Sequence, residues 1–158
     1  MIIIDSQSVR NTDTAREKGY DGNKKVSGIK RHIGVDTQGL PHCIHITTAN
    51  INDRCGALAM LKKDKDNLHK VKNILCDSGY QGINFALNVN NIIKTEVTVI
   101  KRNEVSKFIV LPKRWIVERS FAWLDKCRRL WKNCEGSLHT SKQMIVLAFI
   151  SLILRNRL

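Results

Sequence analysis

The order in which β-type and helical patterns follow one another most restricts how this chain can fold. Three β-type runs come first, and a helix, a strand, a helix, a strand and two closing helices follow. Helices that alternate with the later strands imply an α/β fold in which a mixed sheet is covered on both faces. The five strands are expected in the opening run from Met1 and at residues 31–36, 42–48, 71–76 and 96–100.

Turn and cap residues divide these runs. Residues 10–30 contain three glycines and lose the β pattern, so we predict a loop or ribbon there. Gly39 and Pro41 provide turn chemistry, which predicts a hairpin between the second and third strands. Asn52 or Asp53 is expected to cap the first helix.

Two helices close the chain. The first is predicted at residues 113–132, where helical periodicity gathers the apolar side chains on one broad face. Its polar face consists of Arg114, Glu118, Asp125 and Arg129. The second helix is expected to be capped by Thr140 or Ser141 and carries residues 145–154. Because it is apolar nearly all round, we expect it to be buried against the sheet.

The chain is strongly basic. Its 158 residues include 27 Lys and Arg against 14 Asp and Glu, and its isoelectric point is near 9.9. Such an excess in a small domain favours nucleic acid as the partner, and favours an anionic membrane surface less strongly. Solvated surface charge would need no partner, but it is the weaker interpretation of an excess this large.

Cysteine usage and the apolar runs indicate a cytoplasmic protein. The five cysteines form no Cys-x-x-Cys pair, which is typical of reduced thiols. The opening apolar run meets Asp5 without a basic start, unlike a secretory signal. The longest apolar block, residues 144–154, is interrupted by Ser151 and is too short for a hydrocarbon core of ~30 Å. We therefore predict no membrane span.

Three carboxylates have positions that suggest metal chemistry. Asp5 ends the opening apolar run, Asp77 follows another apolar run, and Glu118 lies on the polar face of the long helix. A carboxylate in an apolar strand is costly to desolvate unless a cation or a donor satisfies it. Two simpler interpretations stay open: Asp77 as a turn former, and Glu118 as an i, i+4 surface partner of Arg114.

Segments along nearly the whole chain resemble a known family, and in the right order. The matching segments are residues 4–9, 19–22, 24–26, 30–32, 35–40, 49–53, 77–82, 111–124 and 128–129. On these segments the chain resembles bacterial insertion-sequence transposases of the DDE type. The resemblance implies a ribonuclease-H-like catalytic core with a mixed five-stranded sheet flanked by helices.

The resemblance also implies a mechanism. Asp5, Asp77 and Glu118 would be the catalytic and metal-binding triad, assisted by Arg114. Oxygen ligands suit Mg²⁺, with Mn²⁺ as a substitute. Paired ions ~3.5–4 Å apart stabilise the attacking and leaving oxygens in such nucleases. Water would free a 3′-hydroxyl at an element end, and that hydroxyl would attack target DNA. The partners implied are double-stranded DNA and further copies of the chain in the active complex.

Two departures from the family pattern keep alternatives open. Leu111 and Asp125 stand where a related signature has tyrosine and lysine, so we do not assign those two roles. The chain also begins at its first catalytic strand, so we expect a single catalytic domain over residues 1–158 without an end-recognition domain. It would be a second-frame product or a truncated remnant. The alternatives are an inactive DNA-binding remnant and, more weakly, an independent ribonuclease-H-like nuclease.

Two basic clusters are candidate phosphate contacts. The first follows the long helix, and the second lies near the glycine-rich segment. Because the helical charge is expected on the side that carries Glu118, we favour DNA contact over a solvated face. The tryptophans are expected to pack at the core or its rim and receive no role. The candidate DNA-binding residues are Lys113, Arg119, Lys126, Arg128, Arg129 and Lys132 in the first cluster, and Lys24, Lys25, Lys30 and Arg31 in the second.

Overall fold

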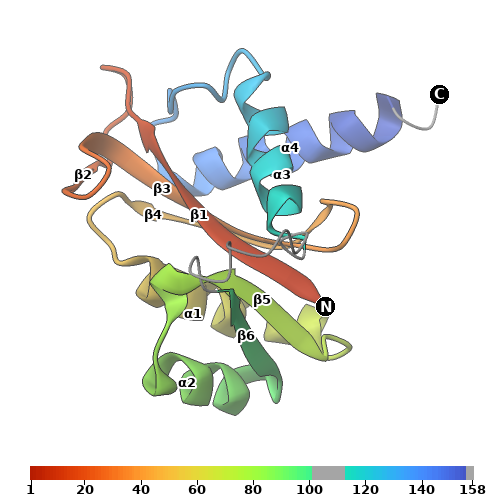
Figure 1. Ribbon diagram of the computed structural model, residues 1–158. Coiled ribbons are helices and arrows are strands. Elements are labelled where there is room, and N and C mark those ends of the chain that lie inside the picture. The colour runs from red at the N-terminus through yellow and green to blue at the C-terminus, as the bar shows by residue number, and fades with distance from the viewer. Residues whose placement is uncertain (101–112, 156–158) are drawn as a thin grey trace, which may run out of the picture.

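A computed structural model describes residues 1–100 and 113–155 of the chain. Its centre is a mixed sheet (Figure 1). Leu111 and Pro112, with which the C-terminal motif begins, lie outside the described residues. The strands are β1 (Ile2–Arg10), β2 (Gly19–Asp21), β3 (Val26–Val35), β4 (Pro41–Thr48), β5 (Asn73–Asp77) and β6 (Glu96–Ile100).

The strand order confirms the expected ribonuclease-H-like sheet. β1 is central: it pairs antiparallel with β3 along one edge and parallel with β5 along the other. β6 extends the sheet parallel to β5, and β4 extends it antiparallel to β3. The five expected strands are present, and the short β2 is an addition that pairs with the first residues of β3. The early strands are therefore antiparallel and the late ones parallel, as the element order requires.

Helices cover both faces of the sheet (Figure 1). On one face lie α3 (Arg114–Asp125) and α4 (Leu138–Arg155), and on the other α1 (Asp53–Lys63) and α2 (Ile83–Ile93). Single 3-10 turns, η1 (Lys65–Leu68) and η2 (Ser78–Tyr80), precede and follow β5. Alternation along β1 supplies both cores: Ile3 and Val9 pack in the α3–α4 core, and Ile2 and Ile4 in the α1–α2 core.

Two expected boundaries are wrong. The segment at residues 10–30 is not all loop, because it contains β2 and the first half of β3. The first closing helix ends at Asp125 rather than at Lys132. Beyond it the chain turns, and the Leu130 carbonyl accepts a 2.6 Å hydrogen bond from Arg31 Nη2 instead of continuing a helix. Residues 126–132 therefore do not share a helical face with Glu118.

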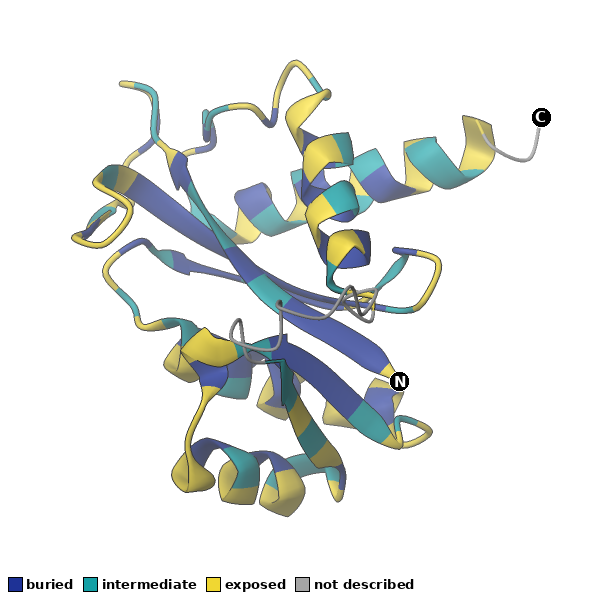
Figure 2. Cartoon of the chain, in the orientation of Figure 1, coloured by how far each residue is buried: buried dark blue, intermediate teal, exposed yellow. Residues whose placement is uncertain are grey.

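The last helix is not buried all round, which corrects another expectation. Ile145 and Phe149 are buried under α4, but Leu147, Ile150 and Leu154 are exposed along its outer side (Figure 2). By length and composition alone α4 could cross a bilayer, but one such helix is weak evidence, because helices of soluble proteins pass the same test. The helix also begins earlier than expected, and Ser137 Oγ accepts from the Thr140 N–H.

At Gly56 the backbone of α1 approaches the sheet closely. Gly56 sits directly against the ring of His32, which is fully buried and bonds through Nε2 to Thr47 Oγ1 at 3.0 Å. Burial lowers the pKa of His32 to about 3, so the ring is neutral in the folded protein. A side chain at position 56 has no room unless the ring moves.

We expect Gly56→Ala to destabilise the fold. Alanine would gain up to about 1 kcal/mol of helix propensity, but overpacking a buried ring costs roughly 1–3 kcal/mol. Gly136→Ala is the matched control, because a Cβ there would have nothing within 4 Å. Urea denaturation of the two variants measures the difference, and equal stabilities would contradict the packing described.

Candidate active site

Strand register brings two of the three candidate carboxylates level with each other. Ile3 of β1 pairs with Leu75 of β5 in a parallel register. Two residues further along each strand stand Asp5 and Asp77, so the same register places them side by side. Both follow short apolar runs because those runs form the buried centre of the sheet.

Arg114 joins the third carboxylate to this pair. Its Nη2 lies 3.4 Å from Asp77 Oδ2, and its Nε lies 3.4 Å from Glu118 Oε1 one turn later on α3. Asp77 Oδ1 also accepts a 2.9 Å hydrogen bond from the Gly79 N–H. The turn-forming role of Asp77 and the surface pair of Glu118 are thus both present, and both belong to the same cluster.

Asp5 is the most perturbed group of the cluster. Burial raises its pKa to about 6 and the nearby Asp77 charge adds to this, while the Ser6 N–H, donating to Oδ1 at 2.8 Å, offsets part of the rise. Asp5, Asp77 and Arg114 line one small hollow, which is otherwise apolar. A perturbed carboxylate beside a charged partner in a hollow is typical of functional sites.

The turn between β3 and β4 sets the orientation of α3, through contacts with the side of the helix opposite Arg114 and Glu118. The Arg119 guanidinium lies 4.7 Å from the ring centroids of both Trp115 and Trp123, and its Nη2 donates to the Gln38 carbonyl at 2.7 Å. The next residue, Ser120, donates from Oγ to the Gly39 carbonyl at 2.8 Å.

These contacts require a tight turn. Gly39 has φ +89°, and a Cβ there would press on Ser120 Oγ. Because Arg119 and Ser120 are held on the turn, Arg114 and Glu118 are directed to the opposite side, towards Asp77.

The donors fit a hard divalent cation, although they are not gathered around one point. Among residues 1–100 and 113–155, no three His, Cys, Asp or Glu side chains stand close enough to hold one ion. Asp77 and Glu118 nevertheless share the single guanidinium of Arg114, and Asp5 pairs with no described cation. The ligands are oxygens, since burial raises the pKa of the neighbouring Cys76 to about 12 and keeps that thiol neutral.

Comparison with known proteins decides the family. The family model described as "Transposase DDE domain" matches residues 1–154. The chain belongs to this family. No curated protein and no solved structure gives a significant match. Membership assigns the chain a role in DNA transposition, and transposases of this family generally use divalent metal ions.

Two of the basic residues expected to bind DNA are structural in this transposase domain. Lys30 is buried, pairs with Asp21 at 3.3 Å and Asp53 at 2.8 Å, and donates to a backbone carbonyl. Arg31 is 1% exposed and donates to the Leu130 carbonyl. Both expectations are corrected for the same reason: β3 is buried on both faces, so neither side chain reaches solvent.

The other basic candidates divide into engaged and free side chains. Arg119 is occupied by its two tryptophans, Arg129 pairs with Glu135 at 2.9 Å, and Lys132 lies over the Trp131 ring at 4.6 Å. Five of the candidates are exposed and form no ion pair with any described residue: Lys24, Lys25, Lys113, Lys126 and Arg128.

The geometry of the candidate site also depends on residues to which the sequence pattern gave no role. Trp115 and Trp123 hold Arg119, and their spacing of four residues on either side of it was the available signal. Of the two expected caps of α1, Asn52 is the cap, and its side chain accepts from the Arg54 N–H at 2.9 Å. Asp53 instead neutralises Lys30, a partner distant in sequence that no local pattern indicates.

We expect Asp5→Asn to stabilise the metal-free domain at neutral pH. The pKa of Asp5 is raised in the fold, so the ionised carboxylate costs stability above about pH 6. As the pH falls from about 6 to about 4, the folded state takes up this proton before the unfolded chain does, and the wild type regains stability. At pH 7.5 the free energy of unfolding of the variant should exceed that of the wild type by up to about 3 kcal/mol. This difference should shrink towards pH 4.

Urea denaturation in EDTA at the two pH values measures this difference. Asp13→Asn, at an exposed position, is the control for the loss of one negative charge. A stability gain of Asp5→Asn that did not depend on pH would show that burial of the charge is not its cause.

We expect Arg119→Ala to cost roughly 1–2 kcal/mol of unfolding free energy. It removes two cation–π contacts and one hydrogen bond to a carbonyl. Arg128→Ala removes the same charge at an exposed position and should change stability by less than about 0.5 kcal/mol. Equal losses in chemical denaturation would mean that the tryptophan contacts contribute nothing.

Proposed function

We propose that this chain is the catalytic domain of an insertion-sequence transposase, which cuts DNA at element ends and transfers the freed strand in a reaction that needs Mg²⁺. The observation that carries the proposal is the register that sets Asp5 beside Asp77, with Arg114 linking Asp77 to Glu118. The raised pKa of Asp5, which burial causes and the neighbouring Asp77 charge increases, supports a functional role for the pair.

Asp5, Asp77 and Glu118 would hold the metal. When bound, Mg²⁺ polarises the phosphoryl group and activates a water molecule. The apolar floor of Ile3, Leu75 and Val117 limits water around the carboxylates. Arg114 then shares its guanidinium between the carboxylates and a phosphate oxygen, for which its planar fork of donors is suited.

The reaction proceeds in two displacements. In the first, a water oxygen bonds to phosphorus and the P–O3′ bond of the element end breaks, which leaves a 3′-hydroxyl and a 5′-phosphate. In the second, the 3′-hydroxyl oxygen bonds to a phosphorus of target DNA and the P–O3′ bond of that phosphodiester breaks, so that the hydroxyl proton ends on the new 3′-hydroxyl of the target strand. The partners are duplex element ends, target duplex and further copies of the chain, in the cytoplasm, where the DNA lies.

One observation favours a second function, a DNA-binding remnant without catalysis. Arg114 bridges Asp77 and Glu118, and no three potential ligands are grouped within the described parts of the chain. Because the Glu118 side chain is 57% exposed, its pair with Arg114 contributes only about 0.3–0.5 kcal/mol and a dication can displace it. We therefore place the active enzyme first.

Cleavage of a duplex that carries the terminal DNA flanking the gene tests the proposal. We expect Mg²⁺-dependent release of a 3′-hydroxyl by the wild type and only background cleavage by Asp77→Asn and Glu118→Gln. Lys62→Gln, an exposed change on α1, should cut like the wild type. Binding without cleavage by the wild type would favour the remnant, and cleavage by Asp77→Asn would refute the triad.

A further inference from the structure

The end of β1 beyond the active site is joined to the loop that follows α3. β1 continues from Asp5 to Arg10, five residues that span about 17 Å at about 3.3 Å per residue. The Asn133 N–H donates to the Arg10 carbonyl at 2.8 Å, and the Thr12 N–H donates to the Asn133 carbonyl at 2.9 Å. The two segments, distant in sequence, therefore form one edge of the molecule.

Asn133 makes this junction firm. Its side chain is buried, donates to Asn11 Oδ1 at 2.9 Å and accepts from Ser141 Oγ at 2.7 Å. Thr14 Oγ1 adds a bond to the Cys134 carbonyl at 3.0 Å. These hydrogen bonds fix the positions of the two segments relative to each other, and a binding surface needs side chains on such a rigid base.

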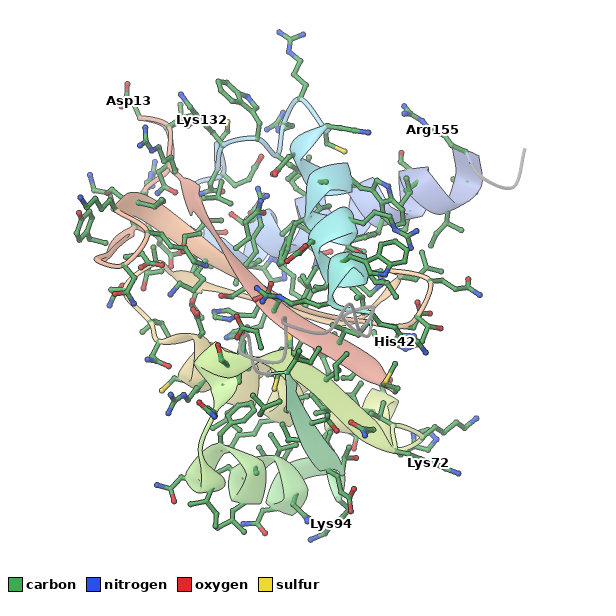
Figure 3. The ribbon with its side chains drawn as sticks, viewed as in Figure 1. Asp13, His42, Lys72, Lys94, Lys132 and Arg155 are labelled. Atoms are coloured by element: carbon green, nitrogen blue, oxygen red, sulfur yellow. The ribbon has the colours of Figure 1, made fainter. Side chains whose placement is uncertain are left out.

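Cations gather on both sides of the junction. Arg10, Lys18 and Lys25 line one hollow, and Arg128 and Arg129 line a second; Thr12 belongs to both. Asp13 is the one acidic residue among the described residues that line them. We call the five cations the terminal shelf; in Figure 3, Asp13 and Lys132 mark this end of the molecule.

The shelf cations are largely free to bind an anion. Arg10, Lys18, Lys25 and Arg128 are exposed, and none makes an ion pair with another residue in the described parts of the chain; Arg129 pairs with Glu135. Half of the remaining lining residues are Thr, Asn or Ser, and Tyr20 is the one large aromatic side chain among the described residues that line the two hollows.

A further cation connects the shelf to the carboxylates. Lys24, beside Lys25 in the turn before β3, donates from Nζ to the carbonyl of Ser6, the residue after Asp5. Positive charge therefore lies beside the active site, at Lys24, and again at the end of β1, while Asp125, which accepts from Gln7 Nε2, lies between them. A duplex carries charge at regular intervals along its axis and can reach both positions, whereas a small anion would occupy one hollow alone.

We propose that the terminal shelf binds the backbone of the duplex that flanks the cut, about five base pairs from the scissile phosphate. The 17 Å from Asp5 to Arg10 corresponds to about five steps of 3.4 Å along DNA. The position of the cut rests on the proposed function, but anion binding by the shelf does not. Contacts of this kind position the duplex and carry no base preference.

Salt titration of duplex binding in EDTA tests the shelf without catalysis. The variant Arg10→Gln, Lys18→Gln, Lys25→Gln should weaken binding and make the log–log salt slope shallower by up to about 2.7, or about 0.9 per phosphate contact. The control, Lys62→Gln, Lys70→Gln, Lys72→Gln, removes the same charge from exposed positions; Lys72 lies at the opposite end in Figure 3. Equal slopes for both variants would overturn the shelf, because net charge alone would then explain binding.

A length series tests the spacing. On hairpin duplexes that end at the cut phosphate, wild-type affinity should rise between about 4 and about 8 base pairs, and the shelf variant should lose this rise. A rise absent from the wild type would overturn the spacing. If the wild type cleaves DNA but the shelf variant binds duplex as the wild type does, only the shelf proposal is overturned. If the shelf variant binds more weakly but the wild type does not cleave, only the proposed function is overturned.

Discussion

The parallel pairing of β1 with β5 is the constraint on which the rest of the structure depends. The paired residues Ile3 and Leu75 are 72 positions apart in the sequence (75 − 3), and only sheet formation brings them together. Apolar residues on both faces of β1 pack against the two helical layers and hold the strand between them. Asp5 is then held partly buried beside Asp77, and the cost of that burial appears as its raised pKa.

A second constraint is the rotation of α3 about its axis. Apolar packing of Ile116, Val117, Phe121 and Leu124 holds the helix on the sheet. Hydrophobic contacts are not directional, so the hydrogen bonds of Arg119 and Ser120 to the β3–β4 turn define the rotation. This directs Arg114 to Asp77, where its guanidinium balances part of the negative charge that a divalent cation would balance more fully.

The net charge of this protein does not show which of its basic side chains are available at the surface. Lys30 and Arg31 belong to the internal structure of β3, where buried partners satisfy them. Five other cations, of which only Arg129 forms an ion pair with a described residue, lie where β1 ends and where the loop after α3 begins, and much of that loop was expected to be helix. An overall excess of charge indicates a polyanionic partner, but only burial and pairing show which cations remain for it.

The sequence by itself determined the element order, the α/β class and the three candidate carboxylates, because apolar periodicity and turn residues act locally. It did not determine that α3 ends at Asp125, because the segment that follows is held by contacts from distant parts of the chain, such as the bond from Arg31 to the Leu130 carbonyl. Nor did it show that α4 exposes Leu147 and Ile150, because apolar residues on all sides of a helix do not say how many neighbours cover it. Only the tertiary structure set Asp5 beside Asp77, because strand register is a long-range property.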